Sequence, residues 1–160
     1  PLEPSEKISL SFPKQLFKSK QLDAMSYWTM DSSTHDYWGK ATYSFDFELM
    51  PEQIKACQIL HLDQVRDWVR IKINGQGLGI VWSLPYQMNI PKGVLKDKNH
   101  IELEVMNVSV NRIRKLDREK TAWKNFYEIN FVDIQYKPFD ASKWGVTESG
   151  LKGELYFSNR

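Results

Sequence analysis

The chain has 160 residues, of which 41% are hydrophobic and 13% aromatic, a composition typical of a folded globular domain. Its 22 basic and 20 acidic side chains leave a net charge of +2, so it lacks the strong positive field that draws in nucleic acid. The single cysteine, Cys57, excludes an internal disulfide and a cysteine-rich zinc site. No apolar run approaches the roughly 18 residues that a membrane-spanning helix needs.

The N-terminal part of the chain predicts a short linker followed by a single domain. Residues 1–7 are polar and contain proline, and the chain starts with Pro1, so we expect a piece of a longer protein with residues 8–160 as one domain. Ile8, Leu10 and Phe12 alternate with polar residues, which predicts a first strand that stops at Pro13. Residues 14–36 have no clean period, and 31–36 have the composition of a loop.

The most regular strand pattern in the sequence covers residues 41–49. Its apolar residues recur with a period of two, which is typical of a strand with one buried face, whereas a helix would spread them around its circumference. Residues 51–56 predict one helical turn, and residues 57–63 a further strand with Leu60 and Leu62 directed inward. The apolar residues of the first pattern are Ala41, Tyr43, Phe45, Phe47 and Leu49.

Residues 68–91 predict a β-hairpin and a third alternating run. Val69, Ile71 and Ile73 share one face of the first strand. The Asn74-Gly75 pair accepts the positive φ angles of a two-residue hairpin turn. Gly77 and Gly79 make the return strand thin, which predicts a bulge or a close backbone approach. Alternation resumes from Tyr86 to Ile90.

The C-terminal half predicts further short strands. Ile101, Leu103 and Val105 alternate with glutamates over residues 100–105, and Leu155 and Phe157 mark a final strand. Residues 112–124 are highly charged and predict a loop or a short helix, 131–136 a strand, and 138–143 a turn. Short strands separated by turns at roughly 8–12 residues predict an all-β antiparallel sandwich.

Several side chains are candidates for carbohydrate contacts. The flat rings of Trp68, Trp82 and Tyr86 match the apolar face of a pyranose, and Asn111 and Arg112 can hydrogen-bond sugar hydroxyls. The alternative is that the rings pack, the asparagines satisfy turn backbone and Arg112 is a surface or interface group. Because no nucleophile elbow, phosphate-binding loop or zinc-protease motif is present, we do not expect catalysis by this chain.

The order of these motifs resembles that of the galactose-binding-domain-like β-sandwich modules of glycoside hydrolases. The resemblance is strongest to the modules near the C-terminus of family 106 α-L-rhamnosidases, and next to the sugar-binding domain of family 2 glycosidases. It begins at YWGKATYSFDFEL (37–49) and runs to the end of the chain. The other matching pieces are Ile73-Asn74-Gly75, Leu78-Gly79, Trp82, Pro85, the run 86–90, HIELEV (100–105), Asn107, Asn111-Arg112-Ile113 and SGLKGELYF (149–157).

This resemblance implies a jelly-roll fold and a non-catalytic accessory role. The module would brace the catalytic domain of a larger glycoside hydrolase and could bind carbohydrate, with the catalytic residues elsewhere in the parent chain. The resemblance also implies a bacterial, periplasmic or secreted location, and a structural calcium for which the sequence names no site. The alternatives are a stand-alone lectin-like protein and a protein-interaction module without a sugar site. No nucleic-acid or membrane partner is expected.

Overall fold

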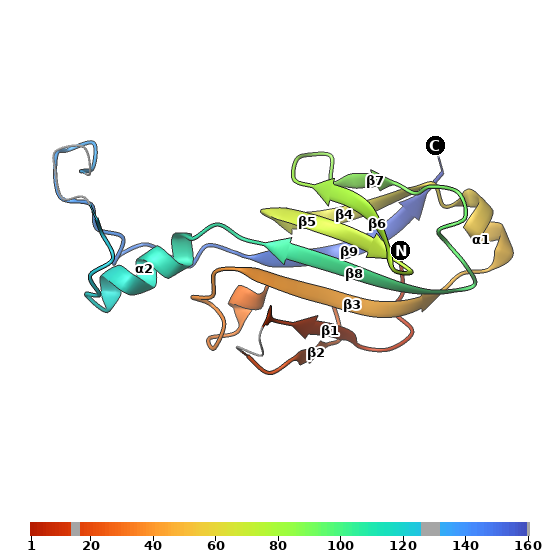
Figure 1. Cartoon of the computed structure of the whole chain (residues 1–160), viewed down its shortest axis with the longest axis horizontal. Coiled ribbons are helices and arrows are strands. Elements are labelled where there is room, and N and C mark those ends of the chain that lie inside the picture. The colour runs from red at the N-terminus through yellow and green to blue at the C-terminus, as the bar shows by residue number, and fades with distance from the viewer. Residues whose placement is uncertain (14–16, 126–131, 160) are drawn as a thin grey trace.

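The computed structural model describes residues 1–13, 17–125 and 132–159. These residues form two antiparallel sheets, one of six strands in the order β2-β1-β3-β8-β5-β6 and one of three strands in the order β7-β4-β9. Buried side chains from both sheets make one hydrophobic core. The predicted all-β antiparallel sandwich is therefore confirmed (Figure 1).

The larger sheet contains β1 (Ile8–Ser11), β2 (Lys20–Leu22), β3 (Lys40–Glu48), β5 (Trp68–Ile73), β6 (Gln76–Val81) and β8 (Lys98–Met106). The smaller sheet contains β4 (Ile59–Arg66), β7 (Gln87–Asn89) and β9 (Gly150–Ser158). The helical elements are η2 (Trp28–Met30), α1 (Pro51–Ala56) and α2 (Val110–Arg118). In Figure 1, α1 lies at one end of the sandwich, while α2 and residues 119–125 project beyond the other end.

The pairing of β3 with β8 forms the centre of the larger sheet. Tyr43 lies opposite Leu103, and Phe45 lies opposite Ile101, in a register that runs without interruption from Lys40 to Glu48. Alternation places the apolar residues of both strands toward the smaller sheet, and this arrangement confirms the predicted burial. The six side chains predicted to be buried, Tyr43, Phe45, Phe47, Ile101, Leu103 and Val105, are all 5% exposed or less.

The hairpin between β5 and β6 is also as predicted. Asn74 has φ 53° and Gly75 φ 79°, as a two-residue turn with the twist of the strands requires. A register shift occurs where Ile71 pairs with Gly79 and Lys72 with Gly77, so the expected bulge is present. Gly79 has φ 140°, and a Cβ there would lie 3.0 Å from Met88 Cε, so the position needs glycine for its backbone and for space.

Two expectations about the C-terminal half need correction. The charged segment contains a helix, but α2 begins at Val110, before the expected range, and ends at Arg118. The strand expected over 131–136 is absent from its described residues, and Phe131 lies outside them. Instead, Asp133 Oδ1 accepts hydrogen bonds from the backbone N–H groups of Gln135 (2.8 Å) and Lys137 (2.9 Å). A carboxylate that binds nearby backbone in this way favours a turn over an extended ladder.

The N-terminal residues contact the sandwich closely. Leu2 is 9% exposed, and its backbone N–H donates to Leu155 O at 2.7 Å. The N–H of Ser5 donates to Asp46 O at 2.7 Å. The segment interpreted as a linker therefore covers part of the core before β1 begins. β2 and η2 fall within residues 14–36, where the sequence has no period that predicts them.

Candidate functional site

Trp68 and Trp82 flank the last residue pair of the β5–β6 ladder, at the end of the larger sheet nearer α2. Val69 pairs with Val81 and both point into the core, so the preceding Trp68 and the following Trp82 face away from it. Trp82 is 72% exposed, whereas Trp68 is half-buried, with the Arg70 guanidinium carbon 5.8 Å from its ring centroid. We call Trp68, Ile80, Trp82 and Met106 the outer aromatic patch.

The loop that follows Trp82 divides its side chains between solvent and core. Leu84 is 77% exposed, but Tyr86 is half-buried and packs against the hydrophobic core. The carbonyl of Tyr86 accepts a hydrogen bond from the N–H of Leu62 at 2.9 Å, which joins the loop to β4. Of the predicted aromatic contacts in this loop, Trp82 is thus the ring that solvent reaches freely.

Asn111 is 1% exposed and hydrogen-bonds to the backbone of the segment that leads into β9. Its Nδ2 donates to Thr147 O at 2.7 Å, and its Oδ1 accepts from Thr147 N at 2.8 Å. Asn107 is similarly buried, with Nδ2 donating to Ser149 Oγ at 3.0 Å. Both asparagines therefore position backbone, as the alternative interpretation of the sequence holds, and neither presents its amide to solvent.

Arg112 is exposed and lies in a different environment from its neighbour Asn111. It borders a hollow of about 470 Å³ between α2 and the loop that precedes β3, which we call the α2 hollow. Trp82 and Arg112 therefore do not line the same hollow, although both lie toward the α2 end. The lining residues are Phe17, Ser32, Ser33, Asp36, Tyr37, Trp38, Arg112 and Lys115.

A buried ion pair fixes α2 to this loop. The Arg114 side chain is 6% exposed, and its Nη1 lies 2.5 Å from Asp36 Oδ1. Its Nε donates to Trp144 O at 3.0 Å. Reasoning from sequence missed Arg114, because it lies among other charged residues and nothing in its spacing distinguishes it from Arg112 or Lys115.

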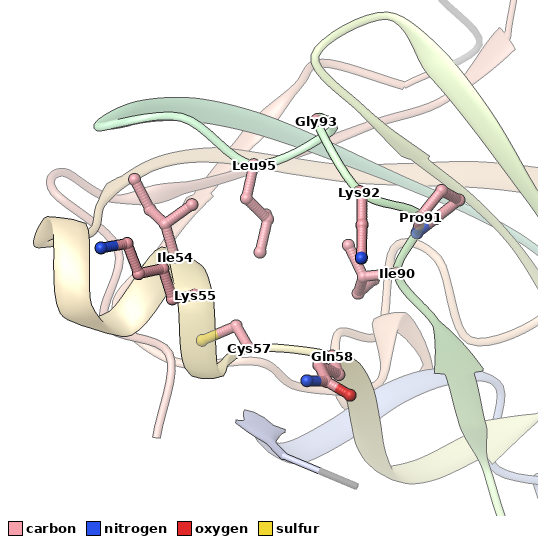
Figure 2. A pocket seen from close by; sticks show the side chains of 9 residues that line it. All are labelled: Ile54, Lys55, Cys57, Gln58, Ile90, Pro91, Lys92, Gly93 and Leu95. Carbon is pink, nitrogen blue, oxygen red and sulfur yellow. The ribbon is translucent and has the colours of Figure 1, made fainter.

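A second hollow, of about 530 Å³, lies at the α1 end (Figure 2). Ile54 of α1 and Leu95 of the connection between β7 and β8 face each other across it, with Lys55 and Lys92 also on its lining. Burial raises the pKa of the Cys57 thiol, so this side chain is protonated at neutral pH and is a poor nucleophile. None of the residues predicted to contact sugar lines this hollow.

Neither hollow brings together the groups that hydrolysis requires. A glycosidase of the common type holds two carboxyl groups about 5 to 9.5 Å apart across the bond. The α2 hollow has one carboxylate on its lining, Asp36, which pairs with Arg114, and the α1-end hollow has none. Across residues 1–13, 17–125 and 132–159, no group of three or more His, Cys, Asp or Glu side chains could hold a metal ion. In those same ranges, no helix is long and apolar enough to cross a membrane.

Comparison with solved structures identifies glycoside hydrolases that contain this fold. A rhamnosidase from Novosphingobium sp. PP1Y aligns with 94% of the chain at a TM-score of 0.70 and 22% identity, and the match covers 14% of that protein. A β-glucuronidase from Ruminococcus gnavus aligns with 67% of the chain at a TM-score of 0.54 and 14% identity, over 22% of its length. At these identities the likeness establishes the fold.

Sequence comparison gives a consistent result. No protein-family model matches the chain. A protein from Formosa agariphila named "Putative beta-glucuronidase" is 24% identical over 110 residues, which make up 65% of this chain and 10% of that protein. The chain thus spans between about a tenth and a fifth of the relatives that it matches. The resemblance to sandwich modules of glycoside hydrolases is confirmed: this chain has the fold of one small part of such enzymes.

Proposed function

We propose that this chain is a non-catalytic accessory module of a larger glycoside hydrolase and that it braces the catalytic domain. The observation that carries this proposal is the coverage, because nearly all of the chain, 94%, aligns with only 14% of a rhamnosidase. The catalytic residues would then lie elsewhere in the parent, which we place in the bacterial periplasm or outside the cell.

The outer aromatic patch is the surface that best suits contact with a catalytic domain. Trp82 and Ile80 are 72% and 47% exposed, and apolar area gains roughly 25 cal/mol per Å² when it is buried. The charges next to the patch already have partners within the sheet, since Arg70 Nη1 lies 3.1 Å from Glu104 Oε1. An apolar patch beside neutralised charges favours an apolar partner, which a neighbouring domain of the same chain can supply.

Melting temperatures of the parent enzyme and of the isolated module test this bracing role. Trp82→Ala should lower the melting temperature of the parent by a few degrees, because about 1 kcal/mol shifts it by roughly 2–4 °C at this domain size. It should leave the isolated module unchanged, since the ring is 72% exposed there. Ile134→Ala, which truncates a side chain that is 97% exposed elsewhere, is the control. Equal shifts in parent and module, or no shift in either, would contradict a docking role for the patch.

Carbohydrate binding is a second candidate function, favoured by the exposure of Trp82. Stacking with a few water-competed hydrogen bonds should give a dissociation constant of roughly 0.1–1 mM, or about −4 to −5.5 kcal/mol. Glycan titrations followed by tryptophan fluorescence measure this affinity, and Trp82→Ala should abolish binding through the loop. If the natural full-length protein binds sugar and contains no catalytic domain, the stand-alone lectin-like alternative is favoured instead. Binding of a protein to the outer aromatic patch, without any response to sugars, would favour the protein-interaction module without a sugar site.

A further inference from the structure

The α2 hollow carries uncompensated positive charge. Arg112 and Lys115 are three residues apart on α2 and therefore lie on the same side of the helix. Within the described residues Arg112 has no ion pair, and Lys115 has a loose one, with Nζ 3.7 Å from Glu119 Oε1. The carboxylate on the lining, Asp36, is occupied by the buried Arg114 at 2.5 Å. Among the described residues, Arg112 therefore faces the hollow without an ion-pair partner, and Lys115 has only the loose contact with Glu119.

Aromatic side chains form the opposite wall of the hollow. Trp38 is 49% exposed and offers an indole ring to solvent. Its neighbour on the lining, Tyr37, is held by edge-to-face contacts with Phe12 and Phe17, at centroid distances of 5.1 and 5.4 Å. The Tyr37 hydroxyl donates to Lys40 O at 2.8 Å, which secures the ring further. An exposed indole ring on a wall that also holds a fixed tyrosine is suited to stacking on the apolar face of a pyranose.

Buried polar contacts hold both walls in place before any ligand arrives. Asn107 Nδ2 donates to Tyr37 O, and Asn107 Oδ1 accepts from Gly39 N, each at 3.0 Å. Gly39 has φ 142°, and a Cβ there would lie 2.6 Å from the Tyr37 hydroxyl, so this close approach requires glycine. On the other wall, Asn111 and Arg114 anchor α2 as described above. Preformed geometry lowers the entropic cost of binding a small ligand.

From this combination we propose that the α2 hollow binds a sugar residue that carries an anionic group, either a carboxylate or a sulfate. Trp38 stacks on the ring, while Arg112 and Lys115 bind the anion, for which the planar guanidinium of Arg112 is well suited. The volume of about 470 Å³ is within the usual range for small-molecule sites. This inference rests on the proposed role in a glycoside hydrolase and adds to it the chemical class of the glycan.

Matched pairs of sugars test the proposal with the full 160-residue chain. Glucuronic acid is compared with its neutral methyl ester, and glucose 6-sulfate with glucose, by following ¹H–¹⁵N NMR shifts. We expect a dissociation constant of about 1 mM for one or both anionic sugars, and at least about fivefold weaker binding of the neutral partner. The two pairs also show whether carboxylate or sulfate is the preferred anion. Affinity should fall as salt is raised from about 50 to 500 mM, since the cations are exposed.

Three variants assign the binding to this hollow. Arg112→Gln should weaken anionic binding about fivefold or more, and Trp38→Ala should remove it, while Trp38→Phe keeps a ring and retains part of it. Arg118→Gln removes an exposed charge from the same helix outside the hollow, and it should leave affinity unchanged. The NMR spectrum of each variant also reports whether it is folded.

Several results would overturn the proposal. These are equal affinity for charged and neutral sugars, absence of any shift at about 10 mM, and equal losses in Arg112→Gln and Arg118→Gln, which would indicate bulk charge. Because the proposed bracing role is measured through Trp82 and the melting temperature of the parent, failure of the sugar site leaves that measurement intact. The two proposals therefore fail separately.

Discussion

The two ends of the sandwich differ in what their buried polar side chains hold in place. At the α2 end, buried polar side chains fix the surface, because Asn107, Asn111 and Arg114 each bond to backbone or to an ion partner. At the α1 end, an asparagine network joins the β5–β6 turn to the β7–β8 connection, since Asn74 Nδ2 donates to Val94 O at 2.8 Å and Asn99 Nδ2 donates to Lys96 O at 2.7 Å, while the hollow itself is lined largely by apolar side chains. Polar networks thus specify the geometry of both ends, but only the network at the α2 end lies behind a hollow that combines cations with an exposed indole ring, so the α2 end is the better candidate for selective recognition.

The hydrophobic core supports both ends, and a change there should have the largest effect. Phe45 is 5% exposed and packs against Phe47 at a centroid distance of 6.3 Å. Phe45→Ala should cost about 3–5 kcal/mol of unfolding free energy, because truncation leaves a cavity between the sheets. Urea unfolding followed by circular dichroism measures this loss. An unchanged melting temperature, or a helix-dominated spectrum of the native protein, would contradict the described core.

A substitution in the polar network at the α2 end should loosen that end and leave the α1 end unchanged. Asn111→Ala removes both hydrogen bonds between the Asn111 amide and the backbone of Thr147 and should cost about 1–3 kcal/mol, since each bond contributes about 0.5–1.5 kcal/mol. Amide hydrogen exchange at Thr147 should become faster. The alkylation rate of Cys57, a reporter at the α1 end, should stay unchanged under native conditions. Equal loosening at both ends would mean that the network stabilises the whole domain.

A smaller and pH-dependent effect is expected from Asp31, in the loop near the α2 hollow. Its bond from Lys20 Nζ at 2.7 Å, together with bonds from Ser33, holds the pKa of the Asp31 carboxyl well below its usual value of 3.8. The folded-state pKa is depressed, so the stabilisation is present above pH 3.8 and is lost as the pH falls toward the folded value.

Asp31→Asn is the variant that measures this contribution. The side chain is 47% exposed, so the substitution should cost no more than about 1 kcal/mol at pH 7. The difference from the unsubstituted chain should shrink as the pH falls from 3.8 toward the depressed folded-state pKa, where Asp31 becomes protonated and neutral in the folded protein as well. Unfolding free energies at several pH values measure it, and a difference that grows on acidification would contradict the assigned pairing.

Strands with strict alternation could be predicted from sequence, whereas the polar contacts at the α2 end could not. The pattern around Phe45 and Ile101 predicts both strand and burial, because a period of two determines which side chains face the core. Asn74-Gly75 likewise predicts its turn from backbone preference alone. By contrast, Asn111 was a candidate for sugar contact from residue type, while its partners at 147 lie 36 residues away. Arg114 was missed for the same reason, since its role depends on Asp36, 78 residues earlier.

The surface aromatic residues show how much of the candidate site could be predicted from the sequence. Trp82 is exposed as expected of a binding residue, because it follows the last inward residue of β6. Trp38 was not among the candidates, although it borders the α2 hollow beside Arg112. Its place depends on how the loop before β3 packs against a helix that comes about 70 residues later, and local periodicity carries no information about that contact.

Hydrolysis by the isolated chain is the measurement that tests the accessory-module account most directly. The protein is incubated at high concentration with aryl glycosides, including the α-L-rhamnoside and the β-glucuronide, and released chromophore is compared with buffer. We predict no product above the buffer rate, because nearly all of the chain aligns with only 14% of a rhamnosidase, so the catalytic residues would lie elsewhere in the parent. Turnover that a single Asp or Glu substitution abolishes would contradict the account, since it would place a catalytic centre on this chain.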